Sequence, residues 1–150
     1  MRPISSRLPP AAMFPAGRAD LRTHYLKLAS GLRVRAVECG KESDPVVVLV
    51  PGWGCSAYIF RENFAALAAA GFRPVAVDLK GHGLSDKPDV PAEYRLDSMR
   101  SHLAEIIDAL GVESVMLTGL SMGAALAAHY ALAHPNRVSG LVMVSPIGFS

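Results

Sequence analysis

The chain has 150 residues, of which 51% are hydrophobic and 19% are charged, so it is long enough to form one domain with a substantial buried core. Its formal net charge of +2 comes from an arginine excess in the first twenty residues, which leaves no basic patch of the kind that binds nucleic acid. Cys39 and Cys55 form neither a CxxC pair nor a metal-ligand cluster with the five histidines. We therefore expect a reduced, cytoplasmic protein without a metal.

The first 21 residues are rich in proline and arginine and show neither helical nor strand periodicity. Pro9, Pro10 and Pro15 interrupt any apolar run that a signal peptide would need. No segment of the chain approaches the roughly 20 uninterrupted apolar residues of a membrane span. We therefore predict a flexible leader over residues 1–21, poorly ordered or extended on the surface, followed by a globular body over residues 22–150.

The body opens with two short alternating runs, Thr23–Leu28 and Leu32–Glu38, which predict an antiparallel hairpin with a glycine turn. From Val46 onward, apolar β-branched runs alternate with runs of helical periodicity. The predicted strands are Val46–Val50, Pro74–Asp78, Ser114–Thr118 and Val138–Val144, and the predicted helices are Ile59–Ala70, Leu96–Leu110 and Met122–His134. This order predicts an α/β fold with a mostly parallel sheet, helices on both faces, and ligands at the carboxyl ends of the strands.

Between the third of these strands and the helix that follows it lies Gly119-Leu120-Ser121-Met122-Gly123, which fits the pattern G-x-S-x-G. In this context the pattern predicts a sharp turn on which Ser121 has a positive φ and an exposed hydroxyl. Ser121 could instead merely cap the helix, but a capping serine does not need glycine on both sides. We therefore predict that Ser121 is a catalytic nucleophile, with the helix N-terminus stabilising nearby negative charge.

An acyl-transfer site also needs hydrogen-bond donors for the oxyanion, and two backbone amides are candidates. One is the amide of Met122, directly after the serine, and the other is the amide of Trp53 in the loop after the Val46–Val50 strand. Gly52 lets this loop pass close to Ser121 without steric cost. The ring of Trp53 could alternatively be a core aromatic in a glycine-rich turn. The expected substrate pocket is lined by Trp53, Gly54, Cys55 and Met122.

Four stretches in order, VVVLVPGWG, VAVDLKGHGLSDKP, VMLTGLSMG and HPNRVSGLVMVSP, resemble the sequential signatures of the α/β-hydrolase superfamily. The resemblance runs from about Arg22 to the end of the chain and implies an α/β-hydrolase fold with a nucleophile elbow at 119–123. Pro51 stands where the family usually has histidine, and Ala124 stands where it often has a second glycine. Because the oxyanion donors are backbone amides, the first departure is expected to be tolerated.

The resemblance implies a serine hydrolase that acts on a small-molecule ester, thioester or related acyl or C–C substrate, without a metal or a cofactor. Relatives that hydrolyse epoxides or haloalkanes normally present aspartate at the nucleophile position, so Ser121 disfavours those activities. Two alternatives remain open. The chain could be a non-catalytic binding module of the same fold. It could also be a cofactor-free haloperoxidase or acyltransferase, which would use the same catalytic triad of serine, acid and histidine.

Family members complete the catalytic triad with an acid and a histidine that follow the serine in the chain. His129 and His134 lie on the helix that the serine opens and point away along its axis. Asp78 and His82 precede the serine and resemble structural positions around the G-H-G turn of the family. We therefore expect residues 22–150 to form an incomplete hydrolase core, without the lid and the C-terminal acid and histidine, and to be inactive alone.

Overall fold

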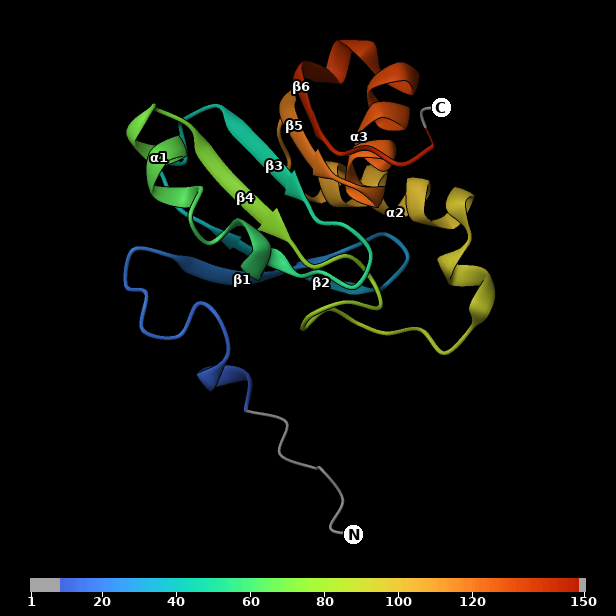
Figure 1. Ribbon diagram of the computed structural model, residues 1–150, viewed down its shortest axis with the longest axis horizontal. Helices are drawn as coiled ribbons and strands as arrows, with labels where there is room; N and C mark the ends of the chain where they lie inside the picture. The colour runs from blue at the N-terminus through green and yellow to red at the C-terminus, as the bar shows by residue number, and fades with distance from the viewer. Residues whose placement is uncertain (1–8, 149–150) are drawn as a thin grey trace, which may run out of the picture.

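The computed structural model describes residues 9–148 and contains one six-stranded sheet in the order β1-β2-β4-β3-β5-β6 (Figure 1). The strands are β1 (Arg22–Lys27), β2 (Arg33–Glu38), β3 (Val46–Val50), β4 (Arg73–Val77), β5 (Val115–Leu120) and β6 (Val138–Val144). The helices are α1 (Phe64–Ala69), α2 (Leu96–Ala109) and α3 (Met122–Ala133), and the 3₁₀ turns are η1 (Pro10–Ala12), η2 (Ala57–Phe60), η3 (Pro91–Tyr94) and η4 (Pro135–Arg137).

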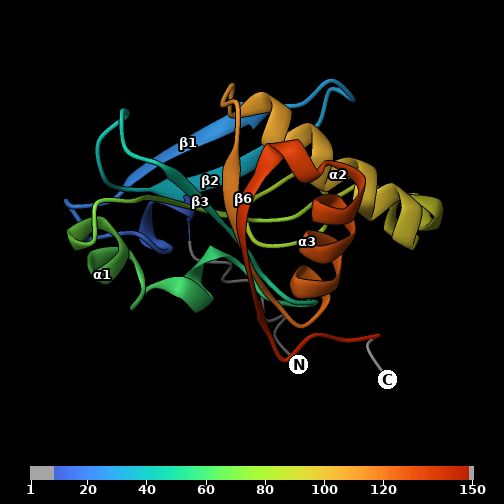
Figure 2. The ribbon, with the colours of Figure 1, turned by 90° about the horizontal axis from the view of Figure 1, so that it is seen from above.

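The sheet is mostly parallel and is covered by helices on both faces. β1 pairs antiparallel with β2 and β2 antiparallel with β4, whereas β4, β3, β5 and β6 are mutually parallel along the sheet. Figure 2 shows α1 on one side of the sheet and α2 and α3 on the other. The predicted α/β fold and its hairpin are therefore confirmed.

One predicted helix is wrong in its first half. Residues 59–70 were expected to form one helix, but η2 and α1 are separate elements joined by a turn. Here the amide of Arg61 donates to the carbonyl of Tyr58 at 3.1 Å, and the amide of Asn63 donates to that of Phe60 at 2.8 Å. These hydrogen bonds span three residues, so the chain winds more tightly than an α-helix before α1 begins.

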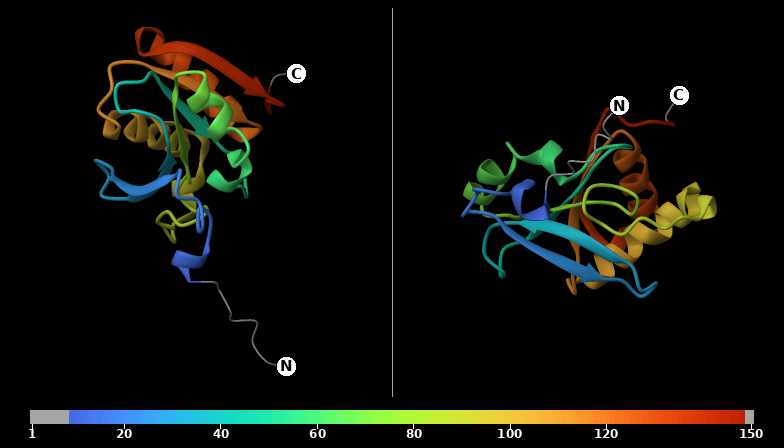
Figure 3. Two further views of the ribbon diagram at one scale, coloured as in Figure 1. Left: turned by 90° about the vertical axis from the view of Figure 1, so that its left-hand side faces the viewer. Right: turned by 90° about the horizontal axis from the view of Figure 1, so that it is seen from below.

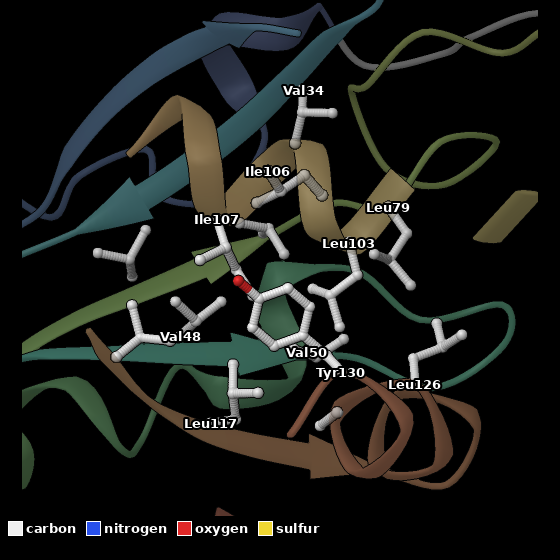
Figure 4. Close-up of a cluster of buried hydrophobic side chains, with 14 of the residues drawn as sticks. Val34, Val48, Val50, Leu79, Leu103, Ile106, Ile107, Leu117, Leu126 and Tyr130 are labelled. Carbon is white, nitrogen blue, oxygen red and sulfur yellow. The ribbon is translucent and has the colours of Figure 1, made fainter. Parts of the chain in front are cut away.

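Alternating side chains along the central strands build a separate hydrophobic core on each face of the sheet. In β3, Val48 and Val50 belong to the core under α2 and α3, whereas Val47 and Leu49 belong to the core under α1. Figure 4 shows part of the first core, where the strands meet α2 and α3 through Leu103, Ile106, Ile107, Leu126 and Tyr130. Because β3 is buried along its whole length, its carboxyl end is held firmly beside that of β5.

β6 lies at the edge of the sheet and leaves apolar side chains exposed. Leu141, Val142, Met143 and Val144 are each 37% to 47% exposed. On the α1 side, Val142, Val144 and Leu120 border an apolar cavity of about 530 Å³. An apolar edge strand of this kind is a surface that favours pairing with further polypeptide. None of the helices within residues 9–148 is both long enough and apolar enough to cross a membrane.

The described part of the predicted leader is residues 9–21, of which Leu21 is buried in the core and residues 9–20 lie against the outside of the sheet domain. Figure 3 shows this blue segment beside the green turn that precedes α1. Phe14 is half-buried, and its ring lies edge-on to that of Tyr58, with 5.5 Å between ring centroids. The rest of the leader, residues 1–8, lies outside the described residues, and the flexibility of the leader stays a prediction.

Candidate active site

Ser121 lies where β5 ends and α3 begins, with φ of 53° and ψ of −116°. Non-glycine residues rarely adopt this conformation, which costs on the order of 1–3 kcal/mol unless the surroundings hold it. Its amide donates to the carbonyl of Val144 at 2.9 Å, and its carbonyl accepts from the amide of Ala124 at 3.0 Å. The predicted positive φ is confirmed. Because the Ser121 side chain makes no capping hydrogen bond to α3, the alternative of a simple helix cap is wrong.

Gly119 and Gly123 allow this turn to form because neither position has room for a side chain. A Cβ at Gly119 would overlap the backbone of Gly123 and Ala124, and a Cβ at Gly123 would overlap the backbone carbonyls of Val50 and Pro51. Both overlaps are with backbone, which cannot move aside as a flexible side chain can. Because the two glycines lack a side chain, the backbones of β5, α3 and the end of β3 can contact one another directly beside the serine.

The loop after β3 passes directly against Ser121. A Cβ built on Gly52 would lie 3.2 Å from the Cβ of Ser121 and 3.2 Å from the carbonyl oxygen of Leu120. The amide of Cys55 donates to the carbonyl of Gly52 at 3.1 Å, which closes a tight turn in which Gly54 has φ of +73°. The close approach predicted for Gly52 is therefore confirmed.

Two backbone amides adjoin this contact, as an oxyanion hole requires. Met122 is the first residue of α3, and the amides of a first helical turn have no acceptor within their own helix. Trp53 follows Gly52 directly in the loop that touches the serine. The assignment of these two amides as oxyanion donors stays a prediction.

The ring of Trp53 lies on the surface. It is 63% exposed and makes an edge-on contact with the ring of His82, at 5.3 Å between centroids and 84° between planes. The alternative that Trp53 is a core aromatic is therefore wrong. Cys55 is half-buried and Met122 is buried. The apolar cavity beside Leu120 is lined by residues other than these three, so the expected pocket around them stays a prediction.

Asp78 is fully buried and its carboxylate is surrounded by donors. Oδ2 accepts from Arg35 Nε and from the amide of Leu84, both at 2.7 Å, and Oδ1 accepts from the amide of Ala57 at 2.7 Å. Arg35 is itself only 3% exposed, so the two charges form a buried ion pair. A carboxylate used in this way orients loops and is not placed to act as a triad acid.

The histidines also occupy structural positions. Nδ1 of His82 lies 2.9 Å from the carbonyl oxygen of Lys80, so this nitrogen carries the proton and donates. His129 lies 2.8 Å from the guanidinium of Arg100, and the ring of His134 packs against Tyr130. With a rise of 1.5 Å per residue, His129 and His134 lie about 12 and 20 Å along α3 from Ser121.

His102 is a structurally important residue whose role was not predicted from the sequence. It is 2% exposed, and its Nε2 accepts a 2.9 Å hydrogen bond from the amide of Lys80, at the start of the turn that carries His82. Burial, and then the charge of Lys80, lowers the pKa of His102 from 6.5 to about 4. The helical spacing of His102 with Met99 and Ile106 places it on the buried face of α2, and this spacing could have revealed its burial.

Protonation of His102 is expected to destabilise the fold. The folded protein keeps this imidazole neutral down to about pH 4, whereas the unfolded chain protonates it near pH 6.5. Stability is therefore lost as the pH falls from 6.5 to 4, by about 3 kcal/mol from this group. Urea unfolding across this range is expected to show a steeper pH dependence for the wild type than for His102→Gln. His134→Gln, at an exposed histidine, is the control and should behave as the wild type. If the free energy of unfolding depended equally on pH in all three proteins, the lowered pKa of His102 would be refuted.

No group of three or more metal-ligating side chains is placed to hold a metal ion in the part of the chain that the structure describes. Both cysteines are free, with Cys39 buried.

The sequence matches the family model described as alpha/beta hydrolase fold over residues 45–149. Among curated proteins, it is 34% identical over 126 residues to Epoxide hydrolase B of Mycobacterium tuberculosis, a match that covers 83% of this chain and 35% of the relative. It is 33% identical over 138 residues to Bifunctional epoxide hydrolase 2 of Sus scrofa, covering 92% of this chain and 24% of the relative. The chain thus spans about a third or less of these two relatives.

Two solved structures resemble the fold closely. Epoxide Hydrolase A from Mycobacterium thermoresistibile superposes with a TM-score of 0.76 at 31% identity, covering 82% of this chain and 38% of that one. The thioesterase domain from the curacin biosynthetic pathway superposes with a TM-score of 0.78 at 28% identity, covering 84% of this chain and 46% of that one.

Proposed function

The chain belongs to the alpha/beta-hydrolase family, and we propose that the protein is a serine hydrolase whose nucleophile is Ser121. The observation that carries the proposal is the positive φ of Ser121 at a strand-to-helix turn, with the Gly52 loop against its side chain. Backbone strain of this kind clusters at functional sites. We include in the proposal the division into a leader (1–21) and a hydrolase core (22–150), and a cytoplasmic location consistent with the two free cysteines.

In the proposed mechanism, Ser121 Oγ attacks the carbonyl carbon of the substrate while a base takes the hydroxyl proton. The negative charge that forms on the carbonyl oxygen is stabilised by the amides of Met122 and Trp53 and by the N-terminus of α3. When this tetrahedral intermediate collapses, the bond to the alcohol or thiol of the substrate breaks, and the leaving group takes up the proton from the base. Water then hydrolyses the acyl ester on Ser121, which releases the acid and restores the serine hydroxyl. Asp78 is held by Arg35, and the histidines of α3 lie far along the helix, so we propose that the base and its acid partner come from elsewhere in the whole protein.

Epoxide hydrolysis is the second candidate activity, because both curated relatives and one of the similar solved structures are named epoxide hydrolases. The nucleophile type argues against it. If Ser121 opened an epoxide, the product would be an ether on the serine, and an ether has no carbonyl for water to attack. An acyl substrate instead leaves an ester on the serine, which water can hydrolyse. This chemical difference supports an ester, a thioester or a related carbonyl compound as the substrate of this protein.

A side-by-side assay tests the substrate class. The whole protein is expected to turn over a short-chain nitrophenyl ester many times per active site, and to open styrene oxide about once per active site or not at all, because the ether would persist. Release of nitrophenol and consumption of styrene oxide should be measured against the concentration of active sites, with Ser121→Ala as the control. Repeated Ser121-dependent turnover of the epoxide would refute the acyl assignment. If the wild-type protein turned over neither substrate, a non-catalytic binding module would be favoured.

A further inference from the structure

The N-terminal segment of residues 9–20, which we call the N-terminal strap, contacts the region that follows residues 51–55. We call these residues, which carry Gly52 and the proposed oxyanion donor Trp53, the oxyanion loop. The ring of Phe14 lies at 79° to that of Tyr58 and at 6.3 Å from that of Phe64, which is fully buried. On Tyr58, the guanidinium of Arg61 lies 4.4 Å from the ring centroid. The strap is therefore anchored by an aromatic cluster with η2 and α1.

The backbone of the strap also contacts the buried ion pair. The carbonyl of Phe14 accepts a hydrogen bond from Nη1 of Arg35, while Nε of Arg35 donates to Asp78 at 2.7 Å. A buried guanidinium is tolerated only when its donors are paired, and the strap supplies one of the acceptors. Removing the strap would expose this donor or leave it without its partner.

Asp78 connects the ion pair to the proposed active site. Its Oδ1 accepts from the amide of Ala57, which lies just beyond the turn that Cys55 and Gly52 close. Its Oδ2 accepts from Arg35 and from the amide of Leu84. A continuous series of hydrogen bonds thus runs from the strap to the end of the loop that touches Ser121.

We propose that the N-terminal strap is a positioning element for the oxyanion loop, acting through Phe14, Arg35 and Asp78. Oxyanion donors contribute most when they are fixed in place before the reaction, and small displacements of such groups reduce the rate strongly. The catalytic consequence rests on the proposed function, whereas the coupling between strap and loop does not. Phe14 touches no reacting atom in this scheme, so it is a positioning residue.

Amide hydrogen exchange in the whole protein tests the coupling without any need for activity. Deleting residues 1–16 or substituting Phe14→Ala is expected to speed exchange in residues 53–58 by about tenfold or more, and to leave residues 100–108 of α2 unchanged. Three controls should match the wild type: deletion of residues 1–8, which keeps Phe14, the conservative Phe14→Tyr, and Tyr25→Ala at an exposed aromatic of β1. Unchanged exchange at 53–58, or an equal rise in α2, would overturn the proposal.

Ester kinetics test the consequence for catalysis. The same two variants are expected to lower kcat by about tenfold or more with KM nearly unchanged, and Phe14→Tyr is expected to restore kcat. If loop exchange rises in the variants but the wild type hydrolyses no ester, the coupling stands and the proposed function fails. If the wild type is active and the variants change neither exchange nor kcat, the proposed function stands and the role of the strap is refuted.

Discussion

Substituting Ser121→Ala in the whole protein is expected to lower kcat for a nitrophenyl ester by about 10⁴- to 10⁶-fold, because the substitution removes the nucleophile. The fold should be retained, since alanine has a Cβ as serine does and meets the same strain at φ of 53°. Steady-state kinetics together with a thermal unfolding midpoint separate the two effects.

Two controls accompany this measurement. Ser101→Ala, at an exposed serine of α2, should leave kcat unchanged. Residues 1–150 alone should give only trace hydrolysis even when folded, because Asp78 is held by Arg35 and the histidines of α3 are far along the helix from Ser121. Full activity of Ser121→Ala would show that the ester is hydrolysed at another site.

The largest effect on stability is expected from Asp78→Asn. This change leaves the Arg35 charge buried without its counter-ion and weakens the acceptors of the Ala57 and Leu84 amides. Removing one partner of a buried ion pair costs about 3–5 kcal/mol, and the free energy of urea unfolding is the quantity to compare.

The matched control for this stability prediction is Asp20→Asn, which breaks an exposed pair with Arg18. Exposed pairs contribute little to stability, so the control should unfold as the wild type does. If Asp78→Asn unfolded at the same denaturant concentration as Asp20→Asn, the buried pair would not hold these loops together.

The features predicted from the sequence are those that depend on local pattern. The continuous apolar run of β3 requires burial on both faces, and all five of its residues are buried. The glycines around Ser121 reflect backbone that approaches too closely for any Cβ, so the turn could be predicted from residue types and order. The conformation of Ser121 could therefore be predicted from the consecutive residues 119–123.

The features that the sequence did not predict depend on contacts between distant segments. Arg35 and Asp78 lie 43 positions apart, and neither position has a local pattern that reveals the other. The contact of Phe14 with Tyr58 likewise joins a proline-rich segment without periodicity to a distant turn. The division of the residues from Ile59 onward into η2 and α1 was likewise not predicted, because helical spacing of apolar residues does not show where three-residue hydrogen bonds replace those of an α-helix.

Covalent labelling would identify the nucleophile of the whole protein without relying on any choice of substrate. The whole protein should be treated with a fluorophosphonate, digested, and mapped by mass spectrometry. We predict a single modified site at Ser121, blocked by prior incubation with ester substrate and absent from Ser121→Ala. Label on a different residue, or no label on a protein that hydrolyses esters, would show that Ser121 is not the nucleophile.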